Sequence, residues 1–332
     1  MVSIVRISVV VPSFKRLERL KECLKGIEGQ TRAPDEVIVV WRDIDPVTGR
    51  WLATWAAEPS RYVRKMPKVQ APGQMLAMAA GLSEANGDVI AFVDDDAVPW
   101  ADWLERLEGH YGNPVVGGIG GRDVVAGDTG PTVDTRLVGR LTWYGRISGN
   151  HHRGGGAPRN VSVLKGVNMS FRRNLARIPQ CLRGDGAQVH NEVYCCLFVK
   201  SLGYQLIYDP AICVDHFPAQ RHDANQRGMI VPTAVRDAAY NVTLSCLLWL
   251  PWYRRILRLA FGLLIGNRSE PGVLRFLLGV VQRDERVTRV FLASMTGQVQ
   301  AVLSARRVRD DETEMSGYTN LRYIIEDPPK ST

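Results

Sequence analysis

The sequence predicts an α/β fold, with a mostly parallel sheet, flanking helices and a helical appendage at the end of the chain. Three observations lead to this prediction. Over residues 7–123, short apolar runs alternate with stretches in which apolar residues recur at helical spacing. One apolar run, residues 89–93, ends abruptly in three aspartates. From residue 231 to residue 306 the patterning is dominated by helical spacing.

Strands and helices are expected to alternate in the first part of the chain. In order, they are strand 7–13, helix 14–27, strand 36–40, helix 46–57, strand 61–66, helix 74–85 and strand 88–93. A helix around Trp103 and Leu107 follows, and then a strand at 114–119. Because the two periods alternate without an internal repeat, we expect parallel strands joined by right-handed crossovers.

The run DVIAFVDDDAVP, residues 88–99, is central to the prediction. Its apolar residues suit a strand covered on both faces, which leaves Asp94, Asp95 and Asp96 at the carboxyl end, where ligands bind in open α/β sheets. Carboxylates this close raise one another's pKa unless a cation offsets their charge, and oxygen ligands suit Mg²⁺ or Mn²⁺. The alternative is that the acids only form a turn and cap the helix that Pro99 opens.

The second half of the chain has a different pattern. Residues 124–159 are rich in glycine and polar side chains and are expected to form a long lid or binding loop. Residues 161–175 are typical of a strand pair that leads into a helix. A helix is expected at 190–202, followed by short strands at 204–208 and 212–214, with His216 just beyond the second strand.

The net charge and the cysteine spacing indicate which partners and which cellular compartment to expect. The formal net charge of +8 predicts an anionic partner, but no nucleic-acid-binding motif is present, so nucleic acid is not expected. The six cysteines lack the paired spacing of zinc sites, and no cleavable signal pattern follows Met1. We therefore expect reduced thiols and a cytoplasmic protein.

The C-terminal helical part contains two strongly apolar runs, residues 244–252 and 256–265, that are too short to span a membrane. Arg254, Arg255 and Arg258 recur at helical spacing beside Trp252 and Tyr253, which suits a helix lying in a membrane interface. This predicts a peripheral position at the inner face of the cell membrane. The alternative is an ordinary helical appendage with a solvated basic face.

Six segments in order resemble the inverting family-two glycosyltransferases of bacterial type, which have the GT-A fold, a Rossmann-like sheet with flanking helices. They are VVVPSFKR (9–16), Gly73 and Gly81 before GDVIAFVDDD (87–96), VGGIGGRD (116–123), KGVNMSFRR (165–173), Asn191-Glu192 with LGYQLIYDP (202–210), and Val214-Asp215-His216. The resemblance covers about residues 7–221. It implies a nucleoside-diphosphate sugar as donor and Mg²⁺ or Mn²⁺ as cofactor.

The resemblance also assigns roles to residues. Asp96 of the DXD-type triplet and His216 would bind the metal, and Glu192 would be the catalytic base. The nucleotide sugar would contact Pro12, Phe14, Asp43, Asp94 and Asp95. Further candidates for the acceptor or the diphosphate are His151, His152, Lys165, Asn168 and Arg172. Two departures from the family pattern are Trp41-Arg42, where an acid often follows the second strand, and Met78-Ala79, where Arg-Asn is frequent.

The implied organisation is a catalytic domain at residues 1–229, a helical membrane-associating region at 230–310 and a polar tail at 311–332. Within the first domain, residues 1–123 would bind the nucleotide sugar and residues 124–229 the acceptor. The implied acceptor is a hydroxyl of a glycan or lipid-linked molecule in envelope or exopolysaccharide synthesis, and the sugar transferred would be a hexose.

Two alternatives are a metal-dependent nucleotidyltransferase and an inactive membrane-surface binding protein of the same fold. The missing phosphate-binding loop G-x-x-x-x-G-K-[ST] disfavours the first, and the intact Asp94, Asp96, Glu192 and His216 disfavour the second.

Overall fold

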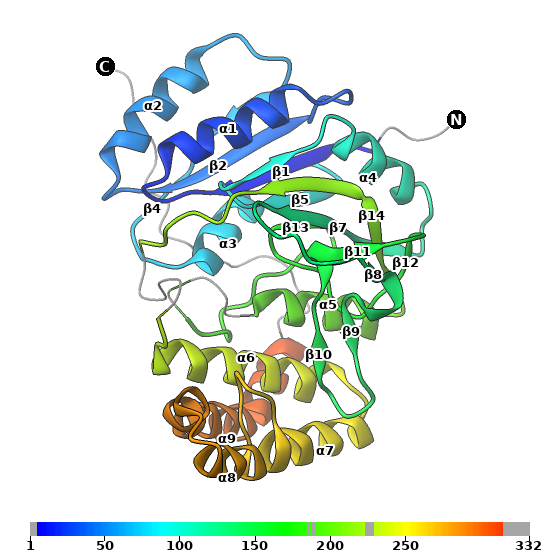
Figure 1. The fold of residues 1–332 in the computed structure, drawn as a ribbon. Helices are drawn as coiled ribbons and strands as arrows, with labels where there is room; N and C mark the ends of the chain where they lie inside the picture. Colours follow the sequence, from blue (N-terminus) through cyan, green and yellow to red (C-terminus); the bar gives the residue numbers. More distant parts are fainter. Residues whose placement is uncertain (1–4, 185, 187–189, 223–228, 315–332) are drawn as a thin grey trace.

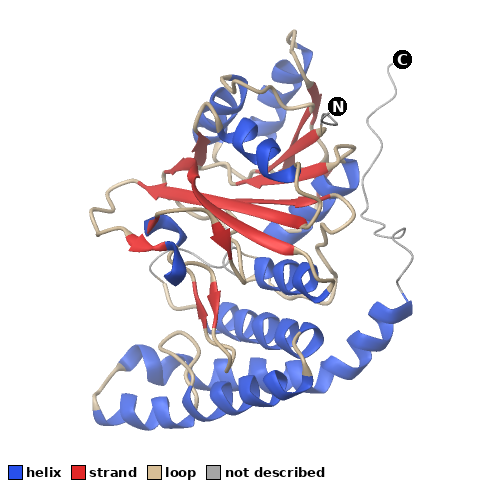
Figure 2. Ribbon diagram, turned by 90° about the vertical axis from the view of Figure 1, so that its right-hand side faces the viewer, coloured by secondary structure: helices blue, strands red, loops and turns tan. Residues whose placement is uncertain are grey.

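A ten-stranded sheet forms the centre of the structure, which is a computed structural model that describes residues 5–184, 186, 190–222 and 229–314. The order of its main path is β12-β14-β7-β13-β5-β1-β2-β3, with β4 beside β2 and β6 beside β14. Helices lie on both sides of this sheet, and a separate helical layer lies below it in Figures 1 and 2. The predicted α/β class with a helical appendage is confirmed.

The first half alternates strands and helices as predicted. Its elements are β1 (Ile7–Pro12), α1 (Leu17–Glu28), β2 (Glu36–Arg42), α2 (Pro46–Ala57), β3 (Val63–Lys65), β4 (Lys68–Val69), α3 (Gln74–Glu84) and β5 (Val89–Val93). β1 lies between β2 and β5 and is parallel to both. All five residues of β5 are buried, so the acids that follow it stand at the edge of the sheet.

The next strands make the sheet mixed. After β6 (Ala97–Pro99) and α4 (Trp103–Tyr111), the chain forms β7 (Val116–Val125), β13 (Asn168–Arg172), α5 (Asn191–Ser201) and β14 (Gln205–His216). β13 is inserted antiparallel between β5 and β7. The expected strand pair at 161–175 is therefore one strand, and turns rather than a helix follow it. The two strands expected at 204–208 and 212–214 are one strand, β14, with a register shift after Asp209.

The register shift in β14 explains why position 121 of β7 is a glycine. Gly121 of β7 lies opposite the irregular part of β14, and a Cβ atom at this position would lie 1.7 Å from the carbonyl oxygen of Ile212. Only glycine lets the two backbones approach so closely. The close approach brings the ends of β7 and β14 together, and these ends carry Asp123 and His216.

The glycine-rich segment at 124–159 is more structured than expected. It contains β8 (Val133–Asp134), η1 (Thr135–Leu137), β9 (Arg140–Leu141), β10 (Ile147–Ser148), η2 (His151–Arg153), β11 (Gly154–Gly155) and β12 (Arg159–Asn160). β9 and β10 form an antiparallel hairpin that runs from the sheet toward the helical layer (Figure 1). Short strand pairings therefore order a segment that its composition predicted to be a loop.

The helical layer consists of α6 (Pro232–Trp249), α7 (Trp252–Ala260), the π-helix η3 (Phe261–Ile265), α8 (Val273–Val281) and α9 (Glu285–Glu314). α6 packs between α5 of the catalytic part and α9. None of the helices in the described residues is long and apolar enough to cross a membrane.

The arginines of α7 do not form the solvent-facing basic surface that the sequence suggested. Arg258 is buried and pairs with Glu270 at 3.2 Å, and Arg254 donates to the carbonyl oxygen of Thr142 at 2.7 Å. Arg255 donates to the carbonyl oxygen of Leu250. Helical spacing was read correctly, but Arg258 is buried against an acid, and Arg254 and Arg255 are half-buried because they donate to backbone carbonyls.

Candidate active site

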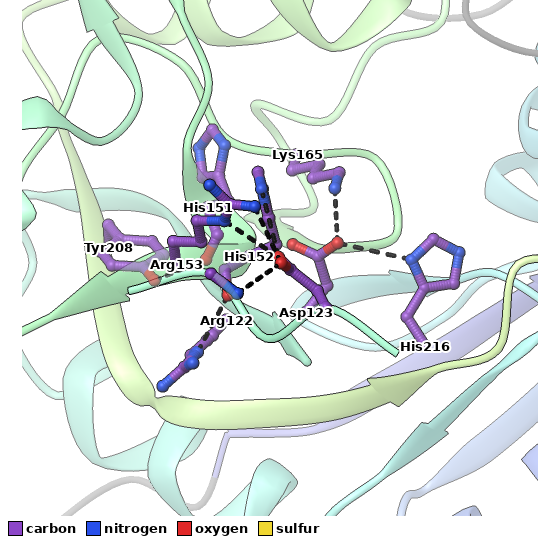
Figure 3. Close-up of polar contacts among 10 residues, drawn as sticks. Arg122, Asp123, His151, His152, Arg153, Lys165, Tyr208 and His216 are labelled. Carbon is purple, nitrogen blue, oxygen red and sulfur yellow. Dashed lines mark hydrogen bonds and ion pairs between the residues drawn. The ribbon is translucent and has the colours of Figure 1, made fainter. Parts of the chain in front are cut away.

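Three strand ends bring together an imidazole and two carboxylates at the carboxyl edge of the sheet. His216 ends β14, Asp96 follows β5, and Asp123 lies near the end of β7. The Nε2 atom of His216 is 3.5 Å from Asp96 Oδ1, and its Nδ1 atom is 3.4 Å from Asp123 Oδ2. Figure 3 shows the Asp123 carboxylate between His216 and Lys165, whose ammonium group pairs with the same oxygen.

The charges at this edge depend on one another. Burial alone lowers the pKa of His216, but Asp123 and Asp96 outweigh it and raise this pKa to about 9. Burial raises the pKa of Asp96, yet the imidazole, the backbone N–H of Ala219 and Arg16 bring it down to about 2. The three residues therefore form a charged cluster at neutral pH in the absence of a metal.

The cluster fits a divalent cation in part. His216 Nε2 and Asp123 Oδ1 are buried and have no hydrogen-bond partner within the described residues. A separation of 3.5 Å between His216 Nε2 and Asp96 Oδ1 suits two neighbouring ligands of one ion at about 2.1 Å each. Across residues 5–184, 186, 190–222 and 229–314, no three His, Cys, Asp or Glu side chains form a ready metal cage. Two protein ligands would therefore need oxygens from a bound diphosphate or from water.

The other two aspartates of the triplet have different surroundings. Asp94 accepts from Gln74 Nε2 at 3.1 Å, and burial together with Asp96 raises its pKa to about 6. Asp95 is buried, accepts from Ser13 Oγ at 2.8 Å and pairs with Arg16 at 2.8 Å. Both Asp95 oxygens are thus used inside the protein. The expected nucleotide contact of Asp95 does not fit this position, which instead locks β5 against β1.

A cavity lies at the start of α3. The residues on either side of Gln74, Gly73 and Met75, line a cavity of about 680 Å³ between the start of α3, the turns at 178–184 and α6. Gly73 has a φ of 129°, which favours glycine and allows the chain to enter α3 at this point. Space for a ligand therefore lies next to Gln74, the residue whose side chain donates to Asp94.

The residues expected to surround a nucleotide lie at the ends of the first two strands. Pro12 ends β1, and the Phe14 ring is half-buried beneath the guanidinium of Arg42 at 4.5 Å. Asp43 follows β2 and its side chain is exposed. The parallel pairing of β1 with β2 and β5 places these three residues on the same edge as Asp94.

Glu192 lies in the first turn of α5, a helix buried on almost every side. Its carboxylate is 3.2 Å from Nδ1 of His190, and the side chain is 18% exposed. Burial raises the pKa of Glu192, but His190 outweighs burial and lowers it below the ordinary value. The same pairing raises the pKa of His190 to about 9 against the effect of burial. A charged, partly accessible carboxylate is thus available near neutral pH.

The two histidines of the glycine-rich segment are placed differently. His151 is 3% exposed, its Nε2 atom lies 3.0 Å from the carbonyl oxygen of Val163, and burial lowers its pKa to about 4. It packs in the interior, so the expected substrate contact does not fit. His152 is half-buried and lies 3.7 Å from Asp128. Lys165 is 37% exposed beside Asp123 and stays a candidate for an anionic substrate.

Two further candidates are structural. The Asn168 side chain accepts from Trp103 Nε1 at 2.9 Å and donates to the carbonyl oxygens of Ile212 and Arg122, so none of its polar atoms is left for a ligand. Arg172 pairs in register with Val89, at the opposite end of β5 from the acids, and donates to backbone carbonyls there. The expected diphosphate contact of Arg172 is wrong because β13 runs antiparallel to β5.

Sequence reasoning missed two charged members of the site, Asp123 and Arg16. Asp123 ends the segment VGGIGGRD, and an acid after a parallel strand was a signal that could have been used, as it was for Asp96. Arg16 pairs with Asp95 at 2.8 Å and lies 3.6 Å from Asp96. No spacing rule shows that an arginine of the loop after β1 reaches the acids that follow β5.

The sequence model of glycosyl transferase family 2 matches residues 8–177, half of the chain. The chain belongs to this family. The match covers β1, β5 and the acid triplet, together with the end of β7 that carries Asp123.

Curated relatives cover a shorter stretch. Glycosyltransferase AglE of Haloferax volcanii is 26% identical over 102 residues, 30% of this chain and 33% of the relative. The uncharacterized glycosyltransferase YwdF of Bacillus subtilis is 30% identical over 105 residues, 31% of this chain and 37% of the relative. This family member thus spans about a third of the length of either relative.

Solved structures show the same fold over most of the chain. The structure of S. aureus TarS residues 1–349 with UDP-GlcNAc has a TM-score of 0.59 at 13% identity and covers 95% of this chain and 93% of its own. Mannosyltransferase PcManGT from Pyrobaculum calidifontis, in complex with GDP-Man and Mn²⁺, has a TM-score of 0.51 at 15% identity, covering 91% and 87%. At these identities the likeness establishes the GT-A fold and nothing finer.

Proposed function

We propose that this protein is a metal-dependent, inverting glycosyltransferase that moves a sugar, a hexose or a close derivative, from a nucleoside-diphosphate sugar to an acceptor hydroxyl. The observation that carries the proposal is the facing pair of Asp96 and His216, with a buried, unpartnered Nε2 atom among the described residues. Family membership and the folds of TarS and PcManGT, bound to UDP-GlcNAc and to GDP-Man with Mn²⁺, support it. The family match weighs against the nucleotidyltransferase alternative.

The nucleotide end of the donor would lie over the edge formed by β1, β2 and β5. Phe14, held under Arg42, offers a flat surface for the base, and Asp94 would accept from the ribose hydroxyls. Asp43, which is exposed just after β2 at the same edge of the sheet, would contact the base. Gln74 already donates to Asp94 and would help to orient its carboxylate.

The residues that would hold Mg²⁺ or Mn²⁺ are Asp96 and His216. The ion, when bound, supplies Lewis-acid stabilisation of the negative charge that develops on the leaving diphosphate. Asp123 accepts from Lys165 and faces His216 Nδ1, so it fixes the ring orientation that leaves Nε2 directed at Asp96. Arg16 compensates the charge of Asp95 and keeps that carboxylate away from the substrate.

Glu192 would be the general base. As the acceptor oxygen attacks the anomeric carbon, the carboxylate takes the hydroxyl proton, a contribution of about 10²- to 10⁴-fold. The lowered pKa of Glu192 keeps it deprotonated near neutral pH. One displacement from the face opposite the leaving diphosphate inverts the anomeric configuration. His190 holds the base at 3.2 Å and is a positioning residue.

The helical layer would place the enzyme at the inner face of a membrane. Large apolar side chains of α7, η3 and α8 are exposed, among them Trp252 at 71%, Leu277 at 53% and Val281 at 81%. A patch of this kind marks an interaction surface. Arg283 and Arg286 are exposed on the same layer and Arg275 is half-buried, which favours an anionic lipid surface. The acceptor would then be a glycan or lipid-linked molecule of envelope polysaccharide synthesis.

The proposal is tested by offering the purified protein a panel of nucleoside-diphosphate sugars with Mg²⁺, Mn²⁺ or EDTA. We expect one donor to be hydrolysed slowly in the presence of Mn²⁺ or Mg²⁺ and to raise the melting temperature, and EDTA to remove both effects. Release of pyrophosphate from a nucleoside triphosphate, or no response to any sugar nucleotide, would overturn the assignment.

A further inference from the structure

The β9–β10 hairpin carries a cavity of about 350 Å³ that the proposed chemistry does not use. Its lining includes Arg140, Trp143 and Arg146, together with the polar side chains of Thr142 and Ser148. The cavity lies on the hairpin that runs from the catalytic sheet to α7 (Figure 1). It is distinct from the cavity beside Gln74, with which it shares no lining residue.

Two cationic groups at this cavity are unpaired. Within the described part of the chain, the guanidinium groups of Arg140 and Arg146 take part in no ion pair and no hydrogen bond. Neighbouring arginines differ, since Arg136 pairs with Asp134 and Arg153 with Asp128. Two unpaired guanidiniums at one cavity attract an anion, and their planar donors suit the oxygens of a carboxylate or phosphate.

An exposed aromatic ring completes the cavity. Trp143 is 66% exposed and stands edge-on to Tyr144, with ring centroids 5.3 Å apart. An exposed indole face is a surface on which the flat C–H face of a sugar ring can pack. Paired with the two arginines, this ring selects a saccharide that carries a negative charge rather than a bare anion or a neutral sugar.

The tip of the hairpin is held against the helical layer. Arg254 of α7 donates to the carbonyl oxygen of Thr142 at 2.7 Å, and Tyr144 packs on Phe261 with ring centroids 4.9 Å apart. Gly145 has a φ of 86°, and a Cβ atom there would lie 2.5 Å from Cδ of Arg258. The tip of the hairpin is therefore fixed against the helical layer, so the cavity is formed before a ligand arrives.

The base of the hairpin is joined to the candidate active site. Asn150 lines the cavity, and two residues later the carbonyl oxygen of His152 accepts from Arg122 at 3.1 Å. Arg122 precedes Asp123, the carboxylate that faces His216 (Figure 3). A long acceptor that reaches the active site can thus follow the hairpin with its more distant units.

We propose that the hairpin cavity is a distal acceptor subsite that binds an anionic saccharide unit, one bearing a carboxylate or a phosphate. Arg140 and Arg146 bind the charge, and Trp143 packs on the sugar ring. The subsite rests on the proposed glycosyl transfer, because it binds the part of the acceptor that does not react. It selects charged, polymeric acceptors over short neutral ones.

The test measures direct binding to the full chain by calorimetry, with three tetrasaccharide probes. One carries a terminal glucuronate, one a terminal sugar phosphate, and one is neutral. We expect a charged probe to bind, with an affinity that falls as salt is added, and the neutral probe to bind at least about tenfold more weakly. Preference for the glucuronate or for the phosphate probe identifies which anion the cavity takes.

The decisive variant is Arg140→Gln/Arg146→Gln, with Trp143→Ala as a second variant. The double variant should weaken the charged probe at least about tenfold and leave the neutral probe unchanged, whereas Trp143→Ala should weaken both. The matched control is Lys25→Gln/Arg50→Gln, which removes two exposed charges on α1 and α2, far from the hairpin in Figure 1. Because all these side chains are exposed, the melting temperatures should agree.

Equal binding of the charged probes by the wild type and the Arg140→Gln/Arg146→Gln variant would overturn the subsite. So would the absence of any preference for a charged over a neutral probe. Metal-dependent hydrolysis of the donor separates this outcome from a failure of the proposed function. The double variant should hydrolyse the donor at the wild-type rate, because Arg140 and Arg146 lie outside the donor site. If the wild-type protein itself does not hydrolyse any donor, that result contradicts the proposed function and not the subsite.

Discussion

The imidazole of His216 and the carboxylate of Asp96 face each other across 3.5 Å, although they follow different strands of the sheet. The register explains the contact, because His216 pairs with Ala97, the residue next to Asp96. Asp123 lies on the other side of the ring at 3.4 Å. This arrangement leaves one buried nitrogen and one carboxylate directed at a common point, and it is the basis of the metal site proposed above.

Asp96→Asn should reduce metal-dependent transfer by about a hundredfold or more. The substitution removes a charged oxygen ligand, and a catalytic metal contributes several kcal/mol to transition-state stability. Steady-state kinetics at saturating Mn²⁺ measure the loss. Asp102→Asn, which breaks a surface pair with Arg106, serves as the control and should keep full activity. Comparable activity of the two variants would remove Asp96 from the metal site.

Glu192→Gln should lower kcat by about 10²- to 10⁴-fold without changing the affinity for the donor, because the amide keeps the shape of the base but cannot take a proton. Product formation and donor binding are measured separately. Glu22→Gln, at an exposed pair with Arg19, is the matched control. Retention of transfer by Glu192→Gln would show that another group is the base.

His190→Asn should move the acidic limb of the kcat/KM profile to higher pH. In the wild type, His190 lowers the pKa of Glu192 against burial, so the base stays charged to low pH. Without the imidazole, burial dominates and the pKa of Glu192 rises, and more of the base is protonated at a given pH. An acidic limb at the same pH in both proteins would mean that His190 does not act through Glu192.

The His190 pairing also predicts a pH dependence of stability. The pKa of His190 is raised to about 9 from an ordinary value of 6.5, so the contribution of the pair is complete below about 6.5 and is lost as pH rises through about 9. The melting temperature of the wild type should therefore approach that of His190→Asn between pH 7 and pH 9.5. A constant difference over this range contradicts the assignment.

Features of the fold and the site that depend on residues close together in the sequence could be predicted, and those that depend on pairing between distant strands could not. The acid triplet at the end of β5 followed from local periodicity, and so did the alternation of strands and helices in the first half. The partners of His216 did not, because Asp123 reaches it through a register shift in β14 that no spacing predicts. Arg172 was predicted at the diphosphate but lies at the opposite edge of the sheet. The sequence did not show that β13 pairs antiparallel to β5.

In the helical layer, the sequence did not show which side chains face the protein interior. Arg254, Arg255 and Arg258 have the spacing of an interfacial basic face, but a spacing does not show which face of a helix is buried. Arg258 is inside because Glu270 offers a buried partner at 3.2 Å. The exposed surface of the layer is apolar instead, and Leu277 and Val281 of α8 are part of it.

Replacement of Leu277, Leu278 and Val281 by serine should weaken binding to anionic vesicles by about tenfold or more, because each apolar side chain buried in a bilayer is worth roughly 1.5–3 kcal/mol. Co-sedimentation with phosphatidylserine and with neutral vesicles measures it. Serine at Val63, Val115 and Leu202, which are exposed outside the helical layer, is the control. Equal sedimentation of both triple variants would exclude docking through α8.

Asn168→Ala should destabilise the fold by about 3 kcal/mol while the KM for the donor stays unchanged. The side chain joins α4 to β7 and β14, and its loss leaves the Trp103 N–H and two carbonyl oxygens without a partner. Chemical denaturation and donor kinetics distinguish the two effects. A raised donor KM at unchanged stability would return Asn168 to the substrate site.

The central claim is that one divalent cation binds between Asp96 and His216 together with the donor diphosphate. Crystals grown with Mn²⁺ and a nucleoside diphosphate, recorded at the manganese absorption edge, test it most directly. We expect an anomalous peak within bonding distance, about 2.1–2.3 Å, of Asp96 Oδ1 and His216 Nε2. A peak elsewhere, or nucleotide bound at this edge with no metal beside it, would contradict the proposed metal site.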